Sequence, residues 1–354
     1  MARWAPVIAV LILTVLLGSL AQGPNPPSTP EKPSSAPAHL RWDGVTILYN
    51  AEDPWSVFES DLSKAVQWGA PCIQIQVSFF SRDHSSAGFP VFDRRSPSLD
   101  QIKEISEAVK SHDKTLVLHP VLLIQDPKSS WWRGQYRPLD NDQWWGDYSQ
   151  WIESLAITAQ ASQVDLLFIG SELTSLQGES ARWADVIQTV RNVFDGSIGY
   201  SANWDSWQQV PFHSQLDLLA LNGYFPLDRP EEDNDPSLTP EEDRARLLPH
   251  WSALKQWTQG NQTPVIFSEV GYPAATRDLS QPWNSNQPQT PLNGALQKRG
   301  FEAFLSVFGL SDLQQGILFY ALHGHDPGTP SGYTPILEET QMLWQKQFQE
   351  SLHR

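Results

Sequence analysis

The sequence predicts an α/β protein built as a single (β/α)8 TIM barrel. Eight short apolar runs alternate with stretches of helical period over the roughly 310 residues from Gly44 onward, a length that fits such a barrel. The runs are nearly continuous in apolar character, as expected for parallel strands that are covered on both faces. A doubly wound open sheet competes with this prediction. The first strand and its continuation, VTILYNAEDPW, contain no glycine and therefore no phosphate-binding loop, which argues against the open sheet.

The predicted elements follow in chain order. The strands are expected at 45–50, 71–80, 115–123, 164–173, 197–203, 216–225, 264–272 and 316–324. Helices fill most of the intervals: Leu99, Ile102, Ile105 and Val109 share one helical face, and residues 183–194 and 304–308 repeat the spacing of three and four. The fifth interval is the weakest, because WDSWQQVPFHSQ leaves room for only a short helix.

The N-terminus predicts export. Residues 1–21 carry one charge, an apolar run and small residues before Gln22, which is the pattern of a cleaved signal peptide; an uncleaved membrane anchor is the alternative. Residues 22–38 are rich in Pro and Ser and are expected to form a linker, and residues 39–354 form the barrel domain. We therefore expect a secreted or periplasmic, cell-envelope protein whose sole membrane contact would be an uncleaved N-terminal segment.

Composition excludes several classes of function. With 40 acidic and 24 basic residues the formal net charge is −16, which argues against nucleic acid as a partner. A single cysteine, Cys72, forms neither an internal disulfide nor a Cys-based metal site, and its apolar surroundings predict a buried core residue. His323, His325 and Asp326 lack an identifiable third ligand group and suit a polar rim loop, so we expect no metal and no cofactor.

Two glutamates close apolar runs at the expected active face of the barrel. Glu172 ends the fourth predicted strand and Glu269 ends the seventh. One such carboxylate is often the first solvated residue after a strand. Two of them at the carboxyl ends of barrel strands form the layout of a glycosidase, in which one carboxyl protonates the leaving oxygen and the other attacks the anomeric carbon.

Several segments resemble glycoside hydrolase family 113, which is known for β-mannanase activity. The similar pieces are WWRGQYRP (131–138), FIGSELTSLQG (168–178), YSANWD (200–205), LLALNGYFPL (218–227), SEVGYP (268–273) and the run 326–335. The resemblance implies that Glu172 is the general acid/base and Glu269 the nucleophile. The sequence departs from the clan at Ser171, where Asn is usual, and from the family at the end of strand three, where it has His119, Pro120 and Val121 in place of Lys-Pro-His.

The remaining candidate site residues follow from strand ends and from the resemblance. Tyr224 is expected to orient the nucleophile by a hydrogen bond, or else to pack its ring on the barrel rim. His119 is either a sugar contact or a core histidine, and Asn203 and Asn222 are either sugar ligands or turn residues. Arg133 and Asp205 are expected to bind hydroxyl groups. The full set of predicted substrate-binding residues is Trp132, Arg133, His119, Ser171, Asn203, Trp204, Asn222, Trp283 and Tyr320.

The 16 tryptophans divide by position. Those in helical stretches are expected to pack the outer layer: Trp68, Trp151, Trp183, Trp251, Trp257 and Trp344. Those in loops on the face of the glutamates are candidate sugar platforms: Trp55, Trp131, Trp132, Trp204, Trp207 and Trp283. Trp144 and Trp145 begin a helix and fit either group.

The sequence supports two functional hypotheses. The first is a retaining glycoside hydrolase that cleaves a β-linked polysaccharide or oligosaccharide, with β-mannan the first candidate and transfer to a sugar acceptor as a variant of the same chemistry. The second is a carbohydrate-binding barrel at the cell envelope that has lost catalysis, a hypothesis motivated by the departures at Ser171 and Val121.

Overall fold

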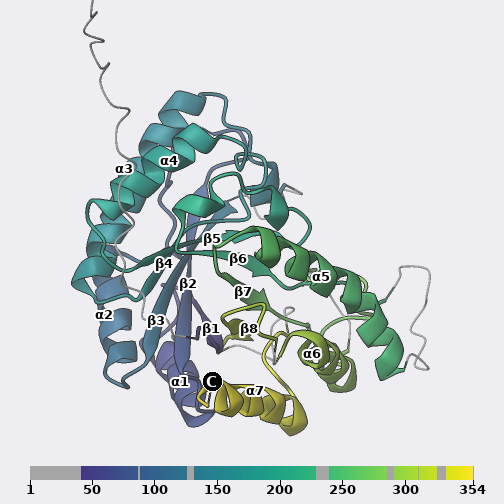
Figure 1. Cartoon of the computed structure of the whole chain (residues 1–354). Coiled ribbons are helices and arrows are strands. Elements are labelled where there is room, and N and C mark those ends of the chain that lie inside the picture. The colour runs from purple at the N-terminus through teal and green to yellow at the C-terminus, as the bar shows by residue number, and fades with distance from the viewer. Residues whose placement is uncertain are drawn as a thin grey trace, which may run out of the picture. The chain divides into compact units, whose positions relative to one another are not determined.

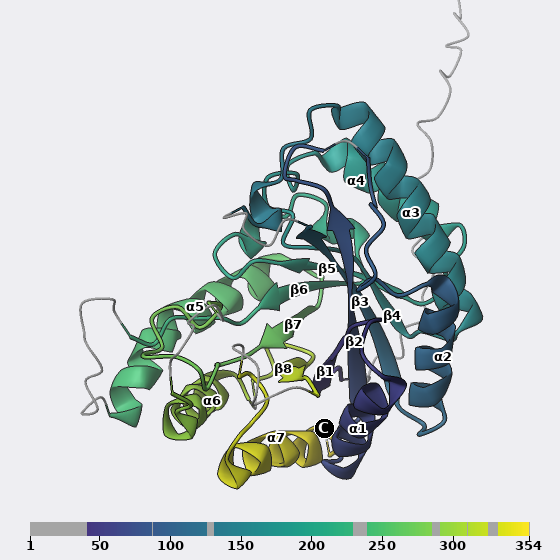
Figure 2. The same cartoon turned by 180° about the vertical axis from the view of Figure 1, so that it is seen from behind.

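The computed structural model confirms the barrel prediction (Figures 1 and 2). It describes residues 41–86, 88–125, 131–228, 239–284, 291–309, 311–324 and 332–353. The expected signal peptide (1–21) and linker (22–38) lie outside the described residues. Across the described ranges, no helix combines the length and apolar character that crossing a membrane requires.

Eight parallel strands close into a barrel in sequence order. They are β1 (Gly44–Tyr49), β2 (Cys72–Ser81), β3 (Thr115–Ile124), β4 (Leu166–Ser171), β5 (Ser197–Ala202), β6 (Leu218–Asn222), β7 (Val265–Val270) and β8 (Ile317–Leu322). Five strands, β4 to β8, are shorter than predicted, and two of these differences affect candidate site residues. Because the chain leaves the ladder at Ser171 and Asn222, Glu172 and Tyr224 stand just beyond β4 and β6 rather than within them.

Seven described α-helices form the outer ring (Figure 1). They are α1 (Trp55–Gln67), α2 (Leu99–Lys110), α3 (Asn141–Ala161), α4 (Ser180–Arg191), α5 (Pro240–Gly260), α6 (Gly294–Phe308) and α7 (Glu338–Ser351). Capping boxes at Ser98 and Thr239 start α2 and α5 by satisfying free backbone N–H groups. Between β5 and β6 the described chain has only the short 3-10 turns η2 (Trp207–Gln209) and η3 (His213–Gln215), as the weak fifth interval predicted.

The helical tryptophans pack the outer core as predicted. All six belong to the main hydrophobic cluster or pack against it. Trp344 on α7 stacks on Phe319 of β8 at 4.8 Å and meets the edge of Trp68 at 5.9 Å, which joins the last helix to the first where α7 lies beside α1 (Figures 1 and 2). Trp144 and Trp145 on α3 are also buried. The ring therefore closes on aromatic contacts.

Three of the six candidate platform tryptophans do not lie where the sequence predicted. Trp207 is buried against Trp257 on α5, at 5.5 Å between ring centroids, because η2 folds it under the β5 loop. Trp55 packs on Phe58 at 4.9 Å in the first turn of α1, and Trp131 stacks on His84 at 4.1 Å. These three tryptophans are not among the residues that line the central cavity described below.

The inside of the barrel has an apolar floor beneath a polar layer. The floor residues are Trp42, Cys72, Val117, Leu166, Phe168, Leu218, Ala220, Ile266 and Leu318. Cys72 is a free, buried thiol within it, as predicted. Above the floor, Gln74 donates to Thr46 Oγ1 and to the Ser268 carbonyl, both at 2.9 Å, so that β1, β2 and β7 are tied together inside the barrel. This layer supports the functional groups above it.

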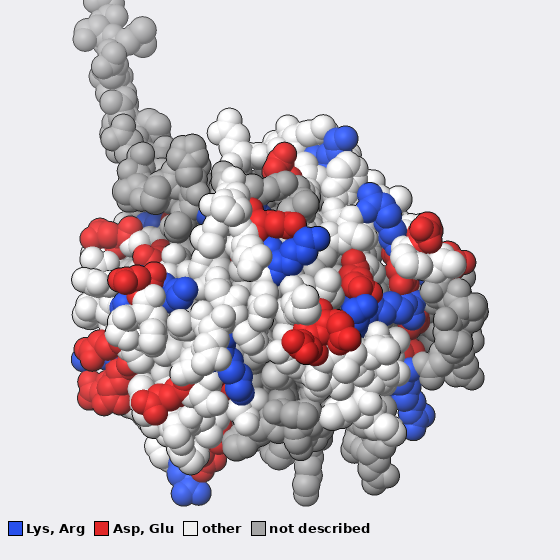
Figure 3. All heavy atoms as spheres, turned by 90° about the horizontal axis from the view of Figure 1, so that it is seen from below, with Lys and Arg blue, Asp and Glu red and all other residues white. Residues whose placement is uncertain are grey.

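Figure 3 shows one outer face of the molecule, where acidic and basic side chains are interspersed on a largely uncharged surface. Lys and Arg on this face lie singly or beside acidic groups rather than in one continuous area. Nucleic-acid binding needs a continuous basic surface, so this face gives no support to that function.

Candidate active site

A chain of hydrogen bonds inside the barrel orients Glu172. The hydroxyls of Ser201 on β5 and Ser268 on β7 both lie within 3.0 Å of Asn222 Oδ1. Because two hydroxyl donors fix the amide oxygen, the amide nitrogen of Asn222 faces the other way and donates to Glu172 Oε1 at 2.5 Å. Asn222 is fully buried, so it acts on Glu172 from below rather than on a ligand in the cavity.

The backbone at Glu172 is in the left-handed region, with φ of 51°. A residue with a Cβ pays a steric cost there, and such residues concentrate at functional sites. The β4–β5 register shifts between Phe168 and Ser171, and the N–H of Glu172 donates to the Ser201 carbonyl at 2.8 Å. This irregular strand end turns the glutamate into the cavity.

A second group, Arg133, reaches Glu172 from the loop after β3. Arg133 begins the turn η1 (Arg133–Gln135), and its Nη2 lies 2.7 Å from Glu172 Oε2. The loop is fixed to the segment that follows Glu172, because Ser175 N–H donates to the Gly134 carbonyl at 3.1 Å and Arg137 donates to the Ser175 carbonyl at 3.3 Å. One oxygen of Glu172 therefore accepts a hydrogen bond from Asn222, and the other forms an ion pair with Arg133.

Glu269 occupies a drier position at the end of β7. Tyr224 donates to its Oε2 at 2.8 Å, as the sequence predicted for an orienting phenol. Burial and the neighbouring Glu172 raise the pKa of Glu269 from 4.5 to about 7, against the opposing effects of Arg133 and the Tyr224 hydrogen bond. The carboxyl is 3% exposed, so desolvation dominates.

His119 on β3 lies under Glu269. Its Nδ1 is 3.8 Å from Glu269 Oε1, which exceeds hydrogen-bond distance, and both atoms lack a hydrogen-bond partner among the described residues. Complete burial, with a contribution from Arg133, lowers the pKa of His119 to about 3, so the ring is neutral. Its contact with Phe168, at 4.8 Å between centroids, fits the core-histidine interpretation.

The two glutamates open into one cavity of about 480 Å³ at the carboxyl ends of the strands, a size typical of a small-molecule site. Its lining residues are Trp132, Arg133, Glu172, Asn203, Trp204, Asp205, Tyr224, Glu269, Trp283, Tyr320 and Tyr333. Three carboxylates and one guanidinium face this space together with six aromatic rings, so the cavity is acidic and largely aromatic.

Three tryptophans from different loops form its aromatic walls. Trp204 after β5 and Trp283 after β7 stack on each other at 5.6 Å with 28° between their planes. Trp132 comes from the β3 loop, where its indole lies against Gly134: a Cβ built on Gly134 would come within 2.1 Å of Trp132 Cη2. Indole faces at these positions suit the apolar C–H faces of sugar rings.

The structure gathers nine of the twelve predicted site residues around this cavity. The other three, His119, Ser171 and Asn222, are at most 2% exposed and lie beneath it, and the hydroxyl of Ser171 has no hydrogen-bond partner among the described residues. Tyr333 lines the cavity, although the sequence interpretation did not single it out. Its signal was the GYTP end of the 326–335 run.

Metal binding finds no support in the described residues. These contain no group of three or more His, Cys, Asp or Glu side chains placed to hold an ion. His325 and Asp326, which with His323 formed the sequence candidate, lie outside the described residues.

Comparison with known proteins places this barrel in a family. The model of glycoside hydrolase family 113 matches residues 57–324, which covers the catalytic face and most of the domain. The chain belongs to glycoside hydrolase family 113. It is therefore a glycosidase, in agreement with the resemblance seen in the sequence. No curated protein sequence matches significantly.

Solved structures share the barrel fold at low identity. A family 113 β-mannanase from Alicyclobacillus acidocaldarius is 18% identical, with a TM-score of 0.73 over 88% of this chain and 98% of that chain. A family 113 β-1,4-mannanase is 15% identical, with a TM-score of 0.74 over 88% and 99%. A β-glucuronidase from Ruminococcus gnavus is 10% identical, with a TM-score of 0.57 over 87% of this chain and 49% of that chain.

Proposed function

We propose that this family 113 member hydrolyses a neutral β-linked glycan, β-1,4-mannan first, with retention of configuration. The observation that carries the proposal is the meeting of two glutamates from β4 and β7 in one aromatic cavity. Glu172 has Asn222 on one oxygen and Arg133 on the other, whereas Glu269 has Tyr224 on one oxygen and no hydrogen-bond partner among the described residues on the other. The two carboxyls thus have different surroundings, as two different roles require.

In the proposed reaction Glu269 attacks the anomeric carbon while Glu172 protonates the departing glycosidic oxygen. The bond from carbon to the leaving oxygen breaks as the bond to Glu269 forms. Glu172 then removes a proton from water, which attacks the same carbon and releases Glu269. Asn222 holds Oε1 of Glu172 from beneath the cavity, whereas Oε2 lies beside Arg133, which lines the cavity, so the proton exchange is assigned to Oε2.

The charge of the cavity supports a neutral substrate. Arg133 is already paired with Glu172, and Asp205 and Glu269 line the same space. An acidic sugar would meet these carboxylates without a free cation among the described lining residues. A β-mannan is neutral and presents apolar ring faces to Trp132, Trp204 and Trp283. The similar solved structures of family 113 are β-mannanases, which supports the same substrate for this chain.

The test is hydrolysis of β-mannans, β-glucans and xylans by the parent chain, with product size and anomeric configuration measured. Glu269→Ala and Glu172→Ala are each expected to abolish cleavage of the accepted glycan while the thermal transition is retained. Azide is expected to restore cleavage of an activated aryl glycoside in the Glu269→Ala variant with inverted product, and in the Glu172→Ala variant with retained product.

A matched control is Glu302→Ala, which removes a carboxylate from the outer face of α6, where it pairs with Lys298 at 2.8 Å, and is expected to leave activity unchanged. Normal activity in either catalytic variant would refute the assignment of roles. If the parent binds glycans but shows no turnover at any pH, the carbohydrate-binding hypothesis replaces hydrolysis.

We also propose that the chain is exported by its first 21 residues. The support is the apolar run and small residues before Gln22. N-terminal sequencing of the protein from an expressing bacterium is expected to begin at Gln22 in the periplasm or medium. A chain that retains Met1 in the membrane fraction would instead identify an anchor.

A further inference from the structure

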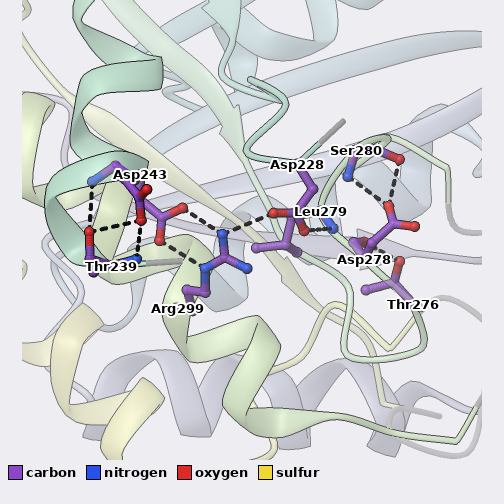
Figure 4. A network of polar contacts seen from close by, with 9 residues as sticks. Asp228, Thr239, Asp243, Thr276, Asp278, Leu279, Ser280 and Arg299 are labelled. Atoms are coloured by element: carbon purple, nitrogen blue, oxygen red, sulfur yellow. Dashed lines mark hydrogen bonds and ion pairs between the residues drawn. The ribbon is translucent and has the colours of Figure 1, made fainter. Parts of the chain in front are cut away.

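A largely buried charge network joins two helices to two active-face loops (Figure 4). Arg299 on α6 donates to Asp243 on α5 through Nε at 2.8 Å and Nη2 at 2.6 Å, and to Asp228 Oδ1 at 2.9 Å. The second oxygen of Asp228 accepts from the N–H of Leu279 at 2.7 Å. Asp228 and Asp243 are 7% and 2% exposed. The guanidinium therefore compensates carboxylates that would be costly to bury alone.

The network ends at the loop that carries one wall of the cavity. The Leu279 carbonyl accepts from the N–H of Leu227 at 2.9 Å, so both backbone groups of Leu279 are held by the segment after β6. Three residues after Leu279, the Pro282 carbonyl accepts a hydrogen bond from the Tyr333 hydroxyl at 2.7 Å. The loop is thus fastened at 279 and at 282, directly before Trp283.

Trp204, the stacking partner of Trp283, is supported from α5, the helix that also carries Asp243. His250 on α5 stacks on Phe225 at 4.2 Å and meets the edge of Trp204 at 5.9 Å. Trp204 stacks on Trp283, which is 44% exposed and lines the cavity. Two tryptophans from separate loops therefore keep one stacked geometry only if their loops are both anchored to the barrel.

We propose that Asp228, held by Arg299, is a positioning residue for glycan binding that acts through Leu279 to fix Trp283. This inference rests on the proposed function, because it takes Trp283 as a sugar contact. A carboxylate suits the task since its two oxygens accept a guanidinium on one side and a backbone N–H on the other, and charge-assisted bonds are the stronger ones. An indole that is held in position before binding contacts a sugar ring without an ordering cost at each binding event.

The test compares Asp228→Asn with Asp243→Asn, because both remove one carboxylate from Arg299 and only the first disturbs Leu279. With β-1,4-mannohexaose, Asp228→Asn is expected to raise KM about tenfold with kcat within about twofold, which is the loss of roughly one aromatic contact. Trp283→Ala is expected to match it, and the double variant to be no worse than Trp283→Ala alone. Asp243→Asn is expected to keep the parent KM.

Hydrogen exchange supplies a readout that is independent of turnover. The Leu279 amide is expected to exchange faster in Asp228→Asn than in the parent or in Asp243→Asn. Three outcomes would each overturn the positioning role. They are a KM in the double variant that rises by the product of the two single effects, a rise of KM in Asp243→Asn equal to that in Asp228→Asn, and unchanged exchange of the Leu279 amide.

The failure of this inference is distinguishable from the failure of the proposed hydrolysis. If the parent binds mannohexaose without cleaving it, hydrolysis is refuted and the same comparisons are made with Kd from calorimetry. If Trp283→Ala changes neither KM nor Kd in a parent that cleaves mannan, the positioning role alone is overturned. A parent that neither cleaves nor binds the oligosaccharide overturns both.

Discussion

The hydrogen bond from Tyr224 to Glu269 gives the sharpest prediction, because its removal moves a measurable pH limb. Tyr224→Phe keeps the ring contacts with Tyr320 and Tyr333 and removes one O–H donor at 2.8 Å. A hydrogen bond to a charged group contributes about 1.5–3 kcal/mol. Since one pKa unit corresponds to about 1.4 kcal/mol, the pKa of Glu269 is expected to rise by about 1–2 units.

The sign follows from the role of the donor. Tyr224 stabilises the ionised carboxylate, so its loss favours the protonated form, and Glu269 must be ionised to attack. The acid limb of kcat/KM, which reports the free enzyme, is expected near the parent pKa of about 7 and to move to higher pH in the variant. The assay is kcat/KM on β-1,4-mannohexaose from pH 4 to pH 10.

The control is Tyr272→Phe. Tyr272 is buried three residues after Glu269, and its hydroxyl has no hydrogen-bond partner among the described residues. This variant is expected to leave the limb in place. A Tyr224→Phe limb at or below the parent value would refute the electrostatic reasoning.

Three further predictions follow from the same geometry. Gly134→Ala places a Cβ within 2.1 Å of the Trp132 indole, so KM for mannohexaose is expected to rise with kcat and Tm nearly unchanged; an unchanged KM would remove Trp132 from the binding surface. Asn222→Ala deletes the donor to Glu172 Oε1 and is expected to lower kcat on mannohexaose about 10- to 100-fold. The loss is expected to be far smaller on a dinitrophenyl glycoside, because its leaving group needs no proton. Equal losses on both substrates would contradict this role of Asn222. A carboxyl whose pKa is raised on folding destabilises the fold as pH rises and the group ionises. Glu269→Gln is therefore expected to raise Tm by about 3 °C at pH 8 and to leave it unchanged at pH 4. An equal shift of Tm at both pH values in calorimetry would argue against a buried charge.

Much of the fold was predictable because it depends on local pattern. Apolar runs separated by helical stretches define the barrel, and the short fifth interval predicted that no more than a short helix lies between β5 and β6. Strand ends were predictable only to a few residues. Glu172 reads as the end of an apolar run, yet its φ of 51° and its place beyond β4 depend on pairing with β5.

Part of the site was predictable because parallel strands deliver their carboxyl ends to one face. That rule alone predicts that Glu172, Glu269 and Tyr224 lie together. It does not decide which polar side chains face a ligand. The side chains of His119 on β3 and Asn222 on β6 point into the barrel. The level of each along the barrel axis depends on the register of its strand.

The sequence by itself indicated the barrel, the family and the pair of glutamates, because apolar runs, helical stretches and short motifs are properties of the local chain. Only the tertiary structure decided the surroundings of those glutamates. Arg133 and Asn222, 89 positions apart in the chain, meet on the two oxygens of Glu172. Trp204 and Trp283 meet from two loops, and Asp228 and Tyr333 hydrogen-bond to the loop that precedes Trp283. Contacts between distant segments depend on the closure and register of the whole barrel, which no local window of residues contains.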